Sequence, residues 1–120
     1  MTIAGKFKKI TSVVIVGNGA VATTLCKHIQ FKGFSIIQQY GRNNRPSIEG
    51  INITDKVSKL NTNADIYIIA VKDDAIEEIV DKMPDVNGLV VHTAGSVDIQ
   101  VFSHKFPNYG VLYPLQSFSK

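Results

Sequence analysis

A glycine-rich motif near the start of the chain is the clearest chemical feature of this sequence. Residues 17–22 read Gly-Asn-Gly-Ala-Val-Ala and match the pattern G-x-G-x-x-A. A β-branched apolar run at residues 13–16 precedes the motif, and a helix-like segment with one apolar face follows at 20–32. A strand, a glycine turn and a helix in this order are typical of a phosphate-binding unit for dinucleotides.

Each residue of the motif has a physical role in that interpretation, and that of Ala22 is to let the helix pack closely on the strand. Gly17 permits the tight turn, and Gly19 lets a pyrophosphate approach the backbone. Asn18, Ala20 and Val21 lie at the positive end of the helix dipole, where free amides would face the phosphates. We therefore predict that these five residues bind a dinucleotide. The alternative is a glycine turn that only connects a strand with a helix.

The loop after the second predicted strand indicates which dinucleotide is expected. NAD-binding domains usually carry an acidic residue there to bond the ribose 2′-hydroxyl, but this chain has no acidic residue before Glu49. Its only two arginines, Arg42 and Arg45, flank Asn43 in this loop instead. Because a guanidinium suits a phosphate dianion, Arg42, Asn43 and Arg45 predict binding of the 2′-phosphate of NADP. The alternative is a solvated basic loop.

The ends of two further predicted strands supply the remaining candidates. Ligands of open α/β sheets lie outside the carboxyl ends of the strands. Val71, Lys72 and Thr93 are therefore expected beside the nicotinamide and its ribose. For Lys72, the alternative is a solvated side chain without a ligand contact. His92 is the candidate catalytic residue, because a histidine can donate a proton at neutral pH. A histidine with a purely structural role fits the same position equally well.

Other polar residues are assigned structural roles. Asp73 and Asp74 are interpreted as helix caps, and Asp74 with Glu77 matches a capping box. His28 and His104 are interpreted as structural or solvated. No metal site is expected from these residues.

Short apolar runs alternate with helix-like segments, which is the pattern of a parallel sheet covered by crossover helices. Strands are predicted at residues 13–16, 34–39, 51–53, 66–71, 89–91 and 110–113, and helices at 20–32, 55–60, 74–83 and 97–106. On the first helix, Val21, Leu25, Cys26 and Ile29 are expected to face the core. We predict an α/β fold, a doubly wound parallel sheet of the Rossmann type with strand order 3-2-1-4-5-6.

Length and composition indicate one soluble globular domain. The chain has 120 residues, of which 44% are hydrophobic and 19% charged, so a single domain over residues 1–120 is expected. Its single cysteine, Cys26, excludes a disulfide within the chain and a cysteine-based zinc site. No apolar run approaches the roughly 18 to 20 residues of a membrane span, and no signal peptide is apparent. We expect a cytoplasmic protein with no membrane contact.

Charge is distributed unevenly along the chain. Residues 1–48 contain seven Lys and Arg residues and no Asp or Glu, so an anionic ligand is expected to meet this half. Aromatic residues make up only 8% of the chain, and the basic residues are interrupted by apolar segments. A nucleic-acid partner is therefore not expected.

The motifs together resemble an uncharacterised family of two-domain Rossmann proteins. The likeness rests on the glycine motif, the Gly-Arg-Asn loop at 41–43, and the segments 64–76, 92–96 and 113–118. That family is similar to pyrroline-5-carboxylate reductases and to the wider 6-phosphogluconate and 3-hydroxyacid dehydrogenase-like group. The resemblance implies a second, helical domain that closes the substrate cleft and forms a homodimer. These 120 residues do not encode such a domain.

The leading hypothesis for function is the NADP-binding domain of an oxidoreductase. Such an enzyme would transfer a hydride between NADP(H) and a small carbonyl, imine or hydroxy compound. A regulatory Rossmann module that senses a nucleotide without turnover is the alternative. A methyltransferase that binds S-adenosylmethionine is a third hypothesis. Both rivals generally use an acidic residue after the second strand, which is missing here.

Overall fold

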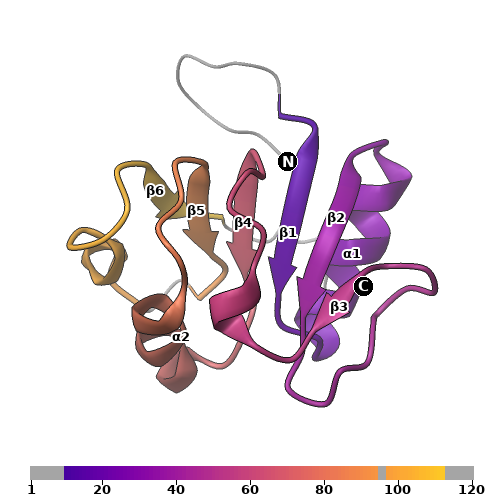
Figure 1. Cartoon of the computed structure of the whole chain (residues 1–120), viewed down its shortest axis with the longest axis horizontal. Coiled ribbons are helices and arrows are strands. Elements are labelled where there is room, and N and C mark those ends of the chain that lie inside the picture. The colour runs from indigo at the N-terminus through magenta and orange to yellow at the C-terminus, as the bar shows by residue number, and fades with distance from the viewer. Residues whose placement is uncertain (1–9, 95–96, 113–120) are drawn as a thin grey trace.

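The described part of the chain forms one parallel sheet of six strands in the order β3-β2-β1-β4-β5-β6 (Figure 1). The computed structural model describes residues 10–94 and 97–112. The strands are β1 (Ser12–Val16), β2 (Ser35–Tyr40), β3 (Ile53–Thr54), β4 (Ile66–Ile69), β5 (Leu89–His92) and β6 (Tyr109–Val111). The chain runs outward from β1 in one direction, returns to β4, and then runs outward in the other direction. The predicted doubly wound Rossmann topology is therefore confirmed.

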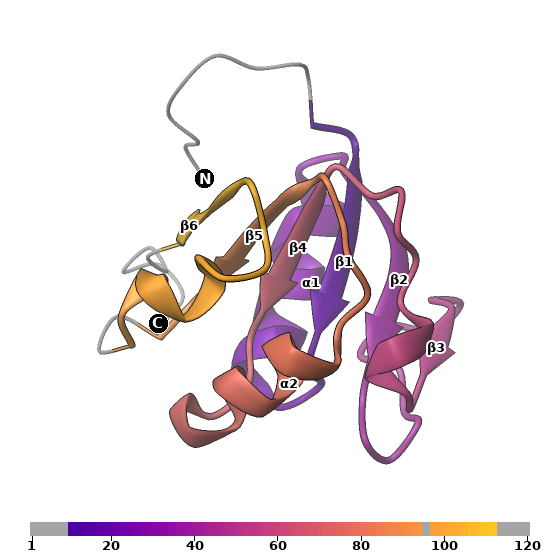
Figure 2. The same ribbon diagram turned by 60° about the vertical axis from the view of Figure 1, so that its left-hand side comes forward.

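The core lies on both faces of the sheet because the central strands are apolar throughout. All residues from Val13 to Val16 in β1 have no exposed surface, and the same is true of Ile66–Ile69 in β4. Side chains of a strand alternate between its two faces. Val13 and Ile15 accordingly pack on the α1 side, whereas Val14 and Val16 pack in the cluster that includes α2. Figure 2 shows the two helices on opposite faces.

Helix α1 (Ala20–Phe31) follows the glycine motif at once. Its buried residues are Ala22, Leu25, Cys26 and Ile29, which repeat at the spacing of one helical face. The prediction that Val21 belongs to this face was wrong, because the side chain of Val21 is 51% exposed. One residue along a helix corresponds to a rotation of about 100°, so Val21 points away from the face that contains Ala22. Beyond the helix, Gly33 has a φ of 90°, as a left-handed terminating residue requires.

Helix α2 (Ile76–Lys82) is preceded by a single 3₁₀ turn, η2 (Asp73–Ala75). The predicted capping box was wrong, because the residue before α2 is Ala75 and the residue before η2 is Lys72. Neither position carries a side-chain cap. Asp73 and Asp74 instead lie inside the first turn, where a negative charge interacts favourably with the helix dipole.

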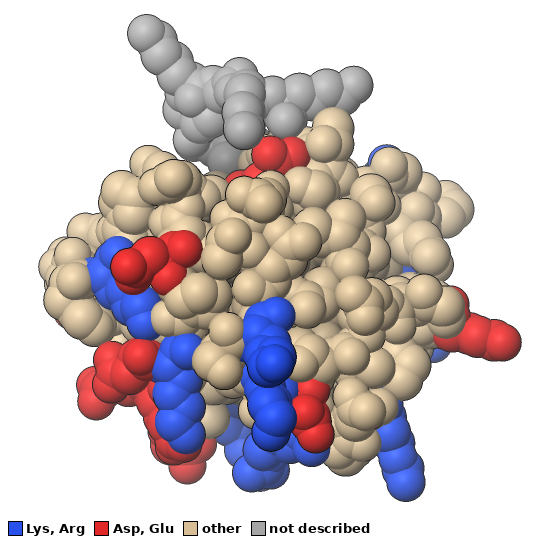
Figure 3. Space-filling view, viewed as in Figure 1, with Lys and Arg blue, Asp and Glu red and all other residues tan. Residues whose placement is uncertain are grey.

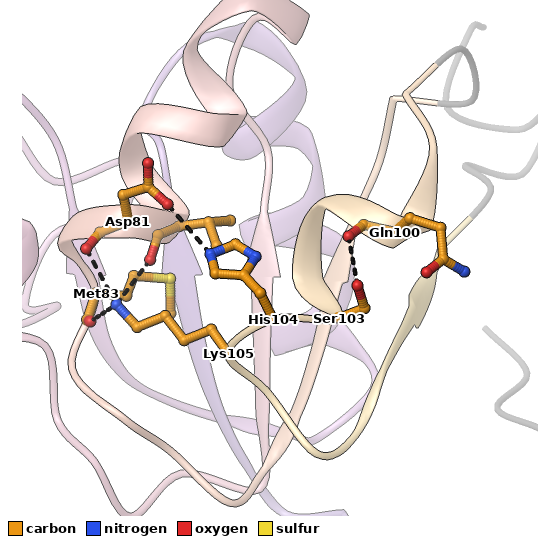
Figure 4. A network of polar contacts seen from close by, with 7 residues as sticks. Asp81, Met83, Gln100, Ser103, His104 and Lys105 are labelled. Atoms are coloured by element: carbon orange, nitrogen blue, oxygen red, sulfur yellow. Dashed lines mark hydrogen bonds and ion pairs between the residues drawn. The ribbon is translucent and has the colours of Figure 1, made fainter.

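A lysine from a later segment caps the other end of α2 (Figure 4). Lys105 Nζ donates hydrogen bonds to the carbonyl oxygens of Val80 and Asp81, at 2.9 Å and 3.1 Å, and to that of Met83. His104 Nε2 lies 3.3 Å from the carboxylate of Asp81. The last carbonyls of a helix lack partners within it, so Lys105 both satisfies them and joins α2 to the segment before β6.

Two predicted helices are only 3₁₀ turns. The segment predicted at 55–60 contains η1 (Val57–Lys59), and the one predicted at 97–106 contains η3 (Ile99–Phe102). Val57 and Leu60 are both buried, and their spacing of three residues suits the period of a 3₁₀ turn. Among the described residues, no helix is long and apolar enough to cross a membrane.

Candidate functional site

A cleft of about 770 Å³ opens at the carboxyl ends of β1 and β4, where the order of the strands reverses. Its walls come from the glycine motif, the end of β2, the residues after β4 and those after β5. Predicted site residues that line it are Asn18, Gly19, Ala20, Val21, Arg42, Val71, Lys72 and Thr93. Lining residues that sequence reasoning did not assign to the site are Tyr40, Ala70, Asp73, Asp74, Ala75, Glu78, Ile79 and Ala94.

The glycine turn forms the floor of this cleft at the end of β1. Gly17 has a φ of 129°, and its amide donates to the carbonyl of Tyr40 at 2.8 Å. A Cβ at this position would overlap the carbonyl oxygen of Ala70 in β4's continuation. A Cβ at Gly19, by contrast, would meet nothing within 4 Å. Gly17 is therefore required by the fold, whereas Gly19 leaves open space that a ligand can approach.

Helix α1 begins at this turn without a side-chain cap. Gly19 occupies the capping position, and the first turn of the helix contains no acidic residue. The amides of Ala20 and Val21 have no partner within the helix, as in any first turn. Both residues are exposed and line the cleft. An uncapped helix terminus facing a cleft is suited to an anion such as a pyrophosphate.

The loop that carries the arginines is joined directly to the glycine turn. Asn18 Nδ2 donates to Asn43 Oδ1 at 2.5 Å and to the carbonyl of Arg45 at 2.9 Å. Arg42 lines the cleft, whereas Asn43 and Arg45 do not. The structure thus separates the two arginines, which the sequence left equivalent.

A second connection runs beneath the turn and uses residues that sequence reasoning missed. Gln39, which has no exposed surface, donates from Nε2 to the carbonyl of Gly17 at 2.8 Å and to the Ser47 hydroxyl at 2.7 Å. The Ser47 hydroxyl also lies 2.8 Å from that of Thr23.

Burial raises the pKa of the Cys26 thiol to about 11, although a hydrogen bond with Ser47 opposes this. Cys26 is therefore a neutral core residue, as its position on α1 predicted.

The wall opposite the arginine loop carries charges of both signs. Lys72, Asp73 and Asp74 follow β4, and Glu78 lies on α2. A salt bridge of 2.8 Å to Lys82 keeps the pKa of the Glu78 carboxyl below its ordinary value. In Figure 3 the acidic and basic side chains gather on the side of the molecule toward which the strands of Figure 1 point. Within the described ranges, no group of His, Cys, Asp and Glu side chains could hold a metal ion.

His92 does not reach the cleft. Its side chain has no exposed surface, its Nδ1 accepts a hydrogen bond of 3.1 Å from the amide of Ala94, and its ring lies 5.3 Å from that of Phe102. Burial lowers the pKa of the imidazole, against smaller opposing effects of the Val97 backbone and of Asp73. This geometry is that of a neutral core histidine, and Thr93 occupies the cleft beside it.

Some predicted motif residues lie outside the described part of the chain. These are Gly95 and Ser96 of the segment after β5, and all of the segment 113–118. The strand predicted at 110–113 is β6, which ends at Val111. Tyr113, the last residue of the predicted strand, belongs to the segment that is not described.

Sheet order, glycine turn and cleft together place the chain in the Rossmann-fold class. A protein from Bacteroides fragilis described as a proposed NADP oxidoreductase is similar, with 34% identity, a TM-score of 0.76, and coverage of 92% of this chain and 46% of that one. A Rex-family repressor shares the fold at 14% identity, with a TM-score of 0.68 and coverage of 92% and 56%. A prephenate dehydrogenase from A. aeolicus, solved with NAD+, shares it at 20% identity, with a TM-score of 0.64 and coverage of 84% and 41%.

This chain spans about half the length of these solved proteins. Comparisons with protein-family models and with curated proteins find no match. The two more distant neighbours establish the fold alone.

Proposed function

We propose that this chain is the NADP-binding part of an oxidoreductase. The observation that carries the proposal is the placement of Arg42 in the same cleft as the uncapped start of α1. No acidic residue stands at the end of β2, where one would favour NAD over NADP. The similar protein from Bacteroides fragilis is described as a proposed NADP oxidoreductase, which supports the same assignment.

The residues present fit this cofactor. The pyrophosphate would lie on the amides of Gly19, Ala20 and Val21, and the open space at Gly19 would admit it. Arg42 would hold the 2′-phosphate, because a guanidinium presents several donors to a dianion. The nicotinamide end would extend toward Lys72 and Thr93 on the opposite wall. The bound cofactor would supply the hydride chemistry.

We further propose that the substrate is a small carbonyl, imine or hydroxy compound and that a second, helical domain completes its site. Hydride transfer needs the substrate carbon held close to the nicotinamide and shielded from water. The described residues provide only one side of such an enclosure. A homodimer formed through that further domain is part of this proposal. The 120-residue chain should therefore bind NADPH and oxidise it negligibly with keto acids, cyclic imines or aldehydes.

A nucleotide-sensing module without turnover is the second candidate. It is favoured by the position of His92, since the predicted proton donor is buried and does not line the cleft. The two candidate functions predict different results for a chain that also contains the proposed second domain. Such a chain should oxidise NADPH with a substrate only if the enzyme proposal is correct.

Calorimetric titration of the chain with NADPH and NADH tests the cofactor assignment. NADPH should bind more tightly than NADH. Arg42→Ala should weaken the affinity for NADPH about 10- to 100-fold, as expected for loss of hydrogen bonds to a charged group. Arg45→Ala is the matched control, because it removes the same charge from the same loop outside the cleft. Equal affinity for NADPH and NADH, or equal effects of the two substitutions, would contradict the proposal.

A further inference from the structure

We propose that Asn18 is a positioning residue that sets the preference for a 2′-phosphate by holding the Arg42 loop against the glycine turn. The inference rests on the proposed function, because it takes NADP as the ligand. Asn18 occupies the variable position of the G-x-G pattern. Its side chain lies between the two segments that would contact the two ends of the ADP portion of the cofactor.

The amide nitrogen of Asn18 is fully used inside the protein. It carries two N–H donors, and these are directed to Asn43 Oδ1 at 2.5 Å and to the carbonyl of Arg45 at 2.9 Å. A backbone carbonyl only accepts, which fixes the orientation of the Asn18 amide. Asn43 Oδ1 also accepts from the Arg45 backbone amide at 3.2 Å, which fixes the orientation of the Asn43 amide as well. Asn18 therefore has no side-chain donor left for a phosphate.

The loop is shaped to fit this side chain. A Cβ on Gly41 would overlap the Asn18 amide group, so the loop can approach Asn18 closely only with glycine there. Asn44 adopts a φ of 58°, and its amide donates to the carbonyl of Gly41 at 2.9 Å. Arg42 lies between two points, Gly41 and Asn43, that both contact Asn18. Its backbone is thereby held in place before any ligand arrives.

A prepositioned Arg42 loses less conformational freedom when it binds a phosphate. Removal of the Asn18 amide should free the loop and raise this entropic cost. The cost applies only to a ligand that uses Arg42. Loss of the Asn18 amide should consequently weaken the binding of NADPH, which carries the 2′-phosphate. The affinity for NADH, which lacks this phosphate, should stay nearly unchanged. A direct contact of Asn18 with the pyrophosphate would weaken both ligands alike.

The test is to measure the dissociation constants of NADPH and NADH for the wild-type chain, Asn18→Ala, Asn43→Ala and the double variant. The ratio of the NADH constant to the NADPH constant should fall about tenfold in each single variant. Because Asn18→Ala already removes the hydrogen bond that Asn43 receives, the ratio for the double variant should fall little further than the ratio for Asn18→Ala. Arg45→Ala keeps the backbone carbonyl that Asn18 binds and should leave the ratio unchanged. Thermal unfolding of each variant identifies any loss of folding.

Each other result has a distinct meaning. A wild-type chain that does not prefer NADPH overturns the proposed function and this inference with it. A wild-type preference that survives in Asn18→Ala and Asn43→Ala overturns the inference alone. Equal weakening of NADPH and NADH in Asn18→Ala also overturns it, since Asn18 would then act on the part common to both ligands. If Asn18→Ala does not fold, Asn43→Ala alone decides the question by the same ratio.

Discussion

Gln39 Nε2 donates a hydrogen bond of 2.8 Å to the carbonyl oxygen of Gly17, although 22 residues separate them in the chain. Gln39 is fully buried near the end of β2, and Gly17 begins the turn at the end of β1. The same side chain also accepts from the Ser47 amide at 2.8 Å. One buried glutamine therefore joins the glycine turn to the far side of the arginine loop.

Gln39→Leu should destabilise the protein by about 2–4 kcal/mol and weaken NADPH binding. The substitution leaves the carbonyl of Gly17 and the amide of Ser47 without their partner, and unsatisfied buried groups are costly. Gln38→Leu is the control, because buried Gln38 bonds the backbone of Lys59 and Asn61, away from the glycine turn. Urea unfolding should show both variants destabilised, whereas titration should show weaker NADPH binding only for Gln39→Leu. An unchanged NADPH affinity in Gln39→Leu would show that the turn keeps its shape without this bond.

Substitution by alanine should strongly reduce stability at Gly17 and have little effect at Gly19. Gly17→Ala should unfold or strongly destabilise the chain, since the added Cβ overlaps Ala70 and the φ of 129° disfavours any side chain. Gly19→Ala should change the free energy of unfolding by less than about 0.5 kcal/mol, because its Cβ enters open space. Gly19→Asp should abolish NADPH binding by adding a negative charge at the proposed pyrophosphate position. Circular dichroism and titration together measure both effects, and full NADPH affinity in Gly19→Asp would make the turn only a connector.

Stability should decline as pH falls below about 6.5, the ordinary pKa of histidine, in part because of His92. Burial lowers the pKa of folded His92, so the unfolded chain binds a proton at a higher pH than the native chain does. Protonation then favours unfolding, and the loss grows down to the folded pKa. Urea unfolding between pH 8 and pH 5 should show a shallower decline for His92→Gln than for the wild type, with exposed His104→Gln as the control. Identical slopes for wild type and His92→Gln would mean that His92 titrates normally.

Lys105→Met should destabilise the protein by about 1–3 kcal/mol, since it removes a charged donor from three carbonyls at the end of α2. Lys82→Met also removes one positive charge, but its salt bridge with Glu78 is largely exposed on both sides. Such a pair contributes little to stability, so the control should leave the free energy of unfolding nearly unchanged. Equal losses in the two variants would contradict the capping role of Lys105.

Local patterns predicted most of the sheet. The strand 13–16 is apolar at every position, which is typical of a strand buried on both faces, and the structure confirms this for β1. Helix boundaries were less accurate where the signal was weak. The capping box at Asp74 failed because a 3₁₀ turn begins the segment and moves the start of α2 to Ile76. Binding of NADP, the roles of the cleft residues and the second domain stay predictions.

The sequence by itself determined the strand at 13–16, the glycine turn, the helix at 20–32 and the strand order that follows from alternating elements. The strand, turn and helix depend on neighbouring residues, so periodicity and glycine placement suffice to predict them. The strand order follows from the general rules for connections in a doubly wound sheet. Only the tertiary structure decided that Arg42 faces the cleft and Arg45 does not, that His92 is buried, and that Gln39 and Asn18 hold the loops. The hydrogen bonds of Gln39 with Gly17 and of Asn18 with Asn43 join residues 22 and 25 positions apart. Such contacts depend on the register of β1 against β2 and on the path of the loop after β2, which no local pattern specifies.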